Sequence, residues 1–101
     1  MAKSAPVKAR EGVERLEDVP NIGQRISEDF RRLGIVSPMQ LAGRDPYQLY
    51  NELCRVTRRR HDPCVLDTFI AAVRYMEGGP NRPWWHFTAE RKRVLGAQKN
   101  S

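Results

Sequence analysis

Apolar residues recur along the chain at the three- and four-residue spacing of an α-helix, and no useful stretch alternates between apolar and polar positions. The clearest helical face carries Ile26, Phe30 and Leu33. The helix that bears this face is expected from about Gly23 to Leu33, and Gly34 is a typical residue to end it. We therefore predict an all-α fold.

Three prolines, each preceded by a capping residue, mark further helix starts. A Ser or Asp side chain accepts hydrogen bonds from the free amides of a helix start, and Pro fits the first helical position. The three pairs are Ser37-Pro38, Asp45-Pro46 and Asp62-Pro63. A short amphipathic helix over 11–18 and a last basic helix from Thr88 complete a compact bundle of about five short helices.

The length and charge of the chain bound its organisation. A chain of 101 residues allows one ordinary domain and excludes two. We place this domain at residues 12–95, between a basic disordered arm at 1–11 and a disordered tail at 96–101. The net charge is +6, but residues 11–87 hold equal numbers of acidic and basic side chains. The positive excess therefore lies in the two ends and says little about the core.

Several classes of protein are disfavoured by what the chain lacks. No apolar run approaches the ~20 residues that cross a bilayer, and no secretory signal is visible, so we expect a cytoplasmic protein without membrane contact. Cys54 and Cys64 are too few for a disulfide scaffold. With His61 and His86 they lack the spacing of zinc knuckles. We expect no metal, no cofactor and no catalytic residue, and hence a protein that is not an enzyme.

The richest functional signal is the segment Val19-Pro20-Asn21-Ile22-Gly23-Gln24-Arg25. Pro20 fixes its own φ, and Asn21 and Gly23 tolerate a positive φ, so we predict a tight turn over 20–23. The helix that follows begins with free amides and a positive dipole end, which favour a phosphate. Arg25 adds a positive charge near that helix start.

This segment resembles the helix-hairpin-helix motif, whose pattern is apolar-Pro-Gly-Ile-Gly-x-Lys-x-Ala. Here Asn21 stands for the first Gly of the pattern and Arg25 for its Lys. The resemblance implies two helices joined by a turn that holds a DNA phosphate without reading bases. The candidate DNA-binding residues are Pro20, Asn21, Ile22, Gly23, Gln24, Arg25 and Arg32.

The resemblance extends over about residues 14–92. Together with the hairpin, Leu33-Gly34-Ile35, Arg60-His61-Asp62-Pro63-Cys64 and Trp84-Trp85 are similar to a small bacterial family. Members of that family are labelled pathogenicity-locus or mitomycin-resistance proteins, which does not state a molecular mechanism. The hairpin is also similar to the C-terminal domain of the competence regulator TfoX.

We expect a module that binds double-stranded DNA without sequence specificity. Because one hairpin covers little DNA, we expect a homodimer or a protein partner. The run Arg58, Arg59 and Arg60 is either a secondary phosphate-binding patch or a set of cations at a helix C-terminus. The alternative function is a non-enzymatic adaptor that docks another protein through the hairpin and Trp84-Trp85, a segment that otherwise closes the core.

Overall fold

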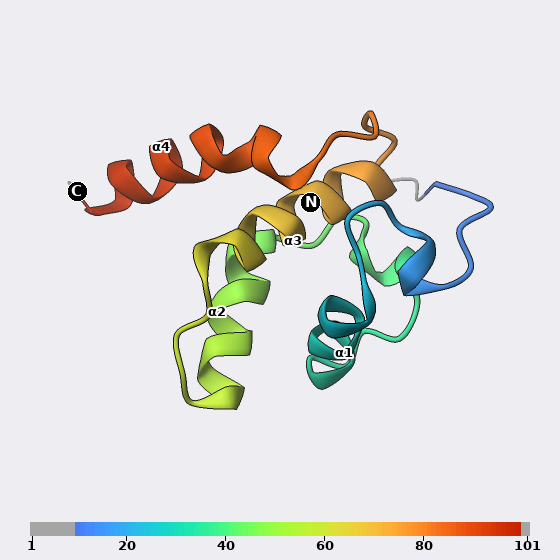
Figure 1. The fold of residues 1–101 in the computed structure, drawn as a ribbon, viewed down its shortest axis with the longest axis horizontal. Coiled ribbons are helices and arrows are strands. Elements are labelled where there is room, and N and C mark those ends of the chain that lie inside the picture. The colour runs from blue at the N-terminus through green and yellow to red at the C-terminus, as the bar shows by residue number, and fades with distance from the viewer. Residues whose placement is uncertain (1–9, 100–101) are drawn as a thin grey trace, which may run out of the picture.

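The computed structural model describes residues 10–99, which form four α-helices and three short 3-10 helices and contain no strand (Figure 1). In chain order, these elements are η1 (Leu16–Asp18), α1 (Gln24–Arg32), η2 (Pro38–Leu41), α2 (Pro46–Thr57), α3 (Pro63–Met76), η3 (Trp84–Phe87) and α4 (Thr88–Lys99). The all-α prediction is confirmed. The remainder of the expected N-terminal arm, residues 1–9, and the last two residues lie outside the described part.

Helix α3 is the centre of the core. Ten of its 14 residues are buried, and α2, η2, η3 and α4 all pack against it. Figure 1 shows α3 crossing the molecule between α4 on one side and α1 and α2 on the other. Phe69 of α3 stacks on Phe30 of α1, with ring centroids 4.6 Å apart. A helix that is apolar on nearly all faces must be covered on nearly all faces, and the other elements do this.

The three predicted Pro starts are confirmed. The carboxylate of Asp45 accepts a hydrogen bond from the Tyr47 N–H at 2.9 Å, at the start of α2. At the start of α3, the carboxylate of Asp62 accepts one from the Cys64 N–H at 2.8 Å. Ser37 caps η2 in the same way, and Pro occupies the first helical turn each time. These starts depend on neighbours in sequence, which explains why they could be predicted.

The prediction of a helix over residues 11–18 is wrong. Only the single 3-10 turn Leu16–Asp18 forms there. Gly12 has a φ of 86° and Arg15 is extended, and an α-helix cannot pass through either conformation. Leu16 is buried, as its apolar spacing suggested, but it lies in a 3-10 turn and not in an α-helix. The described residues therefore hold four α-helices, where about five short helices were expected.

Arg10 is held against the end of α3 and does not belong to the arm that we expected over 1–11. Its N–H donates to the carbonyl of Met76 at 2.8 Å. Its guanidinium donates to the carbonyls of Tyr75 and Gly79, at 2.9 Å and 2.7 Å, and lies 4.1 Å from the centre of the Tyr75 ring. Four contacts on one side chain and its amide thus bring the start of the described chain onto the core.

Helix α4 is fastened to α3 by a buried carboxylate. The side chain of Asp67 is fully buried and accepts hydrogen bonds from the Thr88 hydroxyl and from Nε of Arg91, both at 2.7 Å. Only 14% of the Arg91 side chain is exposed. The hydrogen bond that Arg91 donates to Asp67 raises the pKa of Arg91. Helix α4 continues to Lys99. The tail that we expected to be disordered over 96–101 is therefore helical over 96–99.

We expect Asp67→Asn to lower the free energy of unfolding by about 3 kcal/mol, because it leaves the buried Arg91 guanidinium without its counter-charge. Urea denaturation measures this change. The matched control is Glu52→Gln, which breaks the exposed Glu52–Arg55 pair on α2 and should cost less than about 1 kcal/mol. Equal losses in the two variants would contradict the role given to Asp67.

Candidate functional site

Residues 20–23 form the predicted tight turn, between η1 and α1. Asn21 has a φ of 73°, in the left-handed region that Asn enters more readily than most residues. Ile22 is buried in the core, and its N–H donates to the carbonyl of Val19 at 3.1 Å. The turn is therefore anchored from within by Ile22. The expectation that Asn21 tolerates a positive φ is confirmed, whereas Gly23 is extended and does not use a positive φ.

The side chain of Asn21 joins this turn to a distant part of the chain. Its Nδ2 donates to the carbonyl of Arg82 at 2.8 Å, and its Oδ1 accepts from the Trp84 N–H at 3.2 Å. These partners are 61 and 63 residues away in sequence. Sequence reasoning missed this role, because no local signal in the turn identifies Arg82 or Trp84 as a partner.

Helix α1 begins without a side-chain cap. Its N-cap residue is Gly23, which is extended and has no side chain to accept from the first amides. Asp45 and Asp62 provide such an acceptor at α2 and α3. The space around Gly23 is also open, since a Cβ atom built there would meet no other atom within 4 Å. The positive end of the α1 dipole is thus available to an anion.

The charges of three arginines act on the buried His61. Burial lowers the pKa of His61 most, and the charges of Arg59, Arg25 and Arg32 lower it further. The carboxylate of Asp29 raises it and only partly offsets these effects. Since Arg25 and Arg32 belong to α1 and Arg59 follows α2, the fold brings the predicted hairpin helix and the predicted arginine run together.

The arginines near His61 differ in their availability to a ligand. Arg32 donates to Asp29 at 3.1 Å, so part of its charge is already balanced. Arg25 and Arg59 are exposed, and neither forms a salt bridge in the part of the chain that the structure describes. Arg25 and Arg59 are therefore the better placed of these cations for contact with an external phosphate.

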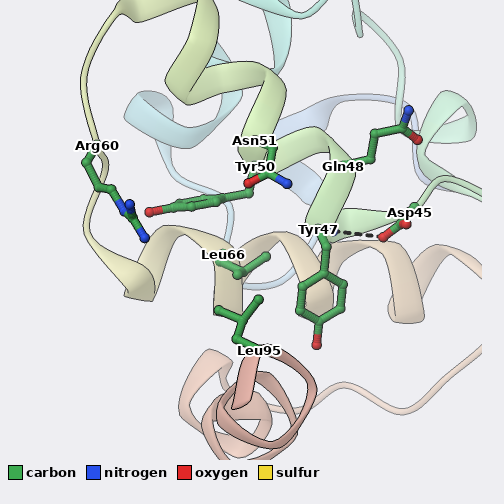
Figure 2. A pocket seen from close by; sticks show the side chains of 8 residues that line it. All are labelled: Asp45, Tyr47, Gln48, Tyr50, Asn51, Arg60, Leu66 and Leu95. Carbon is green, nitrogen blue, oxygen red and sulfur yellow. Dashed lines mark hydrogen bonds between the residues drawn. The ribbon is translucent and has the colours of Figure 1, made fainter. Parts of the chain in front are cut away.

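Arg58, Arg59 and Arg60 have different surroundings in the structure. Arg58 ends α2 with a left-handed φ of 58°. Arg60 instead lines a hollow of about 320 Å³ between α2, α3 and α4, where Figure 2 shows it beside the Tyr50 hydroxyl. Leu66 and Leu95 form apolar parts of this hollow. The secondary patch predicted from the sequence is thus divided between two places.

The comparison with known proteins agrees with the resemblance seen in the sequence. Residues 9–93 match the sequence profile of the family described as Cdd1, Pathogenicity locus. The chain belongs to the Cdd1 family. It is also 45% identical over 83 residues to "Mitomycin resistance protein McrB" of Streptomyces lavendulae, which covers 82% of this chain and 79% of that protein. No solved structure matches the chain significantly. The family assignment is confirmed, and neither printed name describes a molecular activity.

The aromatic segment of this Cdd1-family chain is divided between core and surface. Phe87 is buried and closes the core at the start of α4. Trp84 is half-buried, whereas 63% of Trp85 is exposed. The two Trp rings meet edge to face, with centroids 5.5 Å apart. Phe87 therefore closes the core. Trp85 is an exposed apolar side chain next to Trp84, whose N–H is hydrogen-bonded to Asn21 in the turn.

Other chemistry is sparse in the Cdd1-family chain. The hydrogen bond with Asp62 raises the pKa of the Cys64 thiol, the opposite of the effect expected in the first turn of a helix. Cys54 and Cys64 are both free thiols. Among the described residues, no group of three or more His, Cys, Asp or Glu is placed to hold a metal ion. None of the described helices has the length and apolar character needed to cross a membrane.

We expect Asn21→Ala to lower the free energy of unfolding by about 2 kcal/mol, because it removes both side-chain hydrogen bonds and leaves a side chain poorly suited to a positive φ. Asn21→Gly relieves the backbone strain but still loses the hydrogen bonds, so its loss should be about 1 kcal/mol smaller. Urea denaturation of the three proteins measures both. Wild-type stability in Asn21→Ala would show that the link contributes nothing.

Proposed function

We propose that this protein binds the phosphate backbone of double-stranded DNA, using residues 20–23 as a helix-hairpin-helix turn. One observation carries the proposal. The uncapped start of α1 at Gly23 lies on the same helix as Arg25, and the charges of Arg25 and Arg59 both act on His61, while neither side chain forms a salt bridge among the described residues. Free amides beside unpaired guanidinium groups are a typical arrangement for a phosphate.

The residues of the turn have different tasks in this proposal. Pro20, Asn21 and Ile22 shape and anchor the turn, and the backbone at Gly23 and the residues after it approaches the phosphate. Contacts of the amides of Gln24 and Arg25 and of the Arg25, Arg32 and Arg59 side chains would hold the sugar-phosphate backbone. Such contacts position a protein on DNA but read no base, so binding would be insensitive to sequence.

The acidic residues just before the turn are engaged within the protein: the carboxylate of Asp18 accepts from the Arg15 N–H at 3.1 Å. The carboxylate of Glu17 accepts from the Ser27 hydroxyl at 2.9 Å and from Arg31 at 3.3 Å. Hydrogen bonds to its own backbone amide and to Ser27 lower the pKa of Glu17. Its charge is therefore present but directed to neighbours in the protein, and Arg31 balances part of it.

A single hairpin contacts few phosphates, so we propose that a second copy or a partner protein completes the complex. No catalytic step is part of this proposal. The rival is an adaptor that docks another protein through the turn and Trp84-Trp85. Its support is that Asn21 fastens the turn to Trp84, which makes the turn and the exposed Trp85 neighbours on one surface.

We expect Gly23→Asp to weaken duplex binding at least about tenfold, because the carboxylate would accept from the α1 amides and repel the phosphate. The variant should fold slightly more stably than wild type, by a few tenths of a kcal/mol, because Asp is a good N-cap and the site is open. Gly23→Asn is the matched control: it caps the helix without adding charge and should weaken binding less. Fluorescence anisotropy with a labelled duplex measures the affinities.

If Gly23→Asp binds DNA as tightly as wild type, the turn is not the DNA site and the adaptor function is favoured. The printed name of the Streptomyces relative suggests a cellular readout for the same three proteins. Survival on mitomycin of a strain that depends on this protein should follow the order of duplex affinities if DNA binding underlies resistance.

The affinity for duplex DNA should fall roughly 100-fold between about 50 and about 200 mM salt, if about four phosphates are contacted. The physical reason is that each neutralised phosphate releases condensed counterions, and salt opposes that release. The same anisotropy titration, repeated across salt concentrations, measures the slope. A flat salt dependence would contradict phosphate binding.

A further inference from the structure

The protonation state of His61 follows from its hydrogen bonds. His61 is only 4% exposed, and its Nε2 lies 2.8 Å from the hydroxyl oxygen of Thr57. That hydroxyl donates to the carbonyl of Leu53 at 2.7 Å. Because a hydroxyl has one hydrogen, Thr57 can only accept from the imidazole. Nε2 of His61 therefore carries the proton in the neutral ring, and Nδ1 is a bare acceptor.

A second bare acceptor is buried in the same region. Nδ1 of His61 and Oδ2 of Asp29 are both buried without a hydrogen-bond partner. Asp29 lies on α1, is 3% exposed, and its charge acts on His61. Two buried acceptors without a donor are unfavourable. A proton on Nδ1 would convert one of them into a donor, and the negative charge of Asp29 would favour that proton.

The other charges around His61 oppose that proton in the free protein. They come from Arg59 on the same segment of chain and from Arg25 and Arg32 on α1. Together with burial, they lower the pKa of His61, so the ring is neutral near pH 7. Arg25 and Arg59 are the two cations that the proposed function assigns to a DNA phosphate. Phosphate bound there would offset the charge that opposes the imidazolium.

We infer that DNA binding and protonation of His61 are coupled, so that the protein takes up a proton as it binds a duplex and binds more tightly in mild acid. This inference rests on the proposed DNA-binding function and adds a means of regulation at the same site. The coupling is reciprocal: a bound phosphate stabilises the imidazolium of His61, and the imidazolium strengthens the positive field at the phosphate by the same free energy.

The test compares duplex affinity in wild type, His61→Gln and His86→Gln at constant ionic strength. Gln at position 61 retains an N–H that can donate to Thr57 but does not titrate. His86 is the other histidine of the chain, is exposed on η3, and provides the matched control. Wild type and His86→Gln should gain affinity as the pH falls from about 8 to about 5.5, by a few-fold and at most about tenfold, since tenfold is the ceiling that a one-unit rise in the pKa of His61 on binding sets. His61→Gln should lose this gain.

A second measurement needs no variant. NMR titration of the His61 ring in the full chain should show its pKa raised when the duplex is bound. Equal pH dependence in wild type and His61→Gln, or a His61 pKa that DNA does not move, overturns the coupling and leaves duplex binding intact. Failure of wild type to bind the duplex at any pH overturns the proposed function, and the coupling with it.

Discussion

The arrangement of the molecule depends on the burial of α3. A 14-residue helix with ten buried residues is stable in water only when other elements cover it, and here α2, α4, η2 and η3 do so. The Phe30–Phe69 stack brings α1 to the same core. Helix α1 also contacts α2. The cluster of arginines around His61 is a consequence of this packing.

Polar groups then decide details that apolar burial leaves open. Asp67 is a carboxylate inside the core, and its bonds to Thr88 and Arg91 determine where α4 leaves the bundle. Asn21 does the same for the turn, because it fastens that turn to the backbone around Trp84. Burying a polar group costs free energy unless the group has a hydrogen-bond partner. The elements that carry such a pair are therefore held in the orientation that keeps its hydrogen bonds.

The helix starts at Ser37, Asp45 and Asp62 could be predicted because capping depends on the residue itself and its next few neighbours. The helix expected over 11–18 failed for a related reason. Apolar spacing reports which residues are buried, but a turn can bury Leu16 as well as a helix can. The positive φ of Asn21 was likewise local and predictable, whereas its partners, more than sixty residues away, were not.

The sequence by itself thus determined the all-α class, most helix starts, the turn over 20–23 and membership of the Cdd1 family. Tertiary structure alone decided that Arg59 joins Arg25 around His61 while Arg60 lines another hollow. It also decided that Phe87 closes the core and leaves Trp85 exposed. The physical reason is range: capping and turn preferences act over a few bonds, whereas the neighbours of a charge or ring depend on how the helices pack around α3.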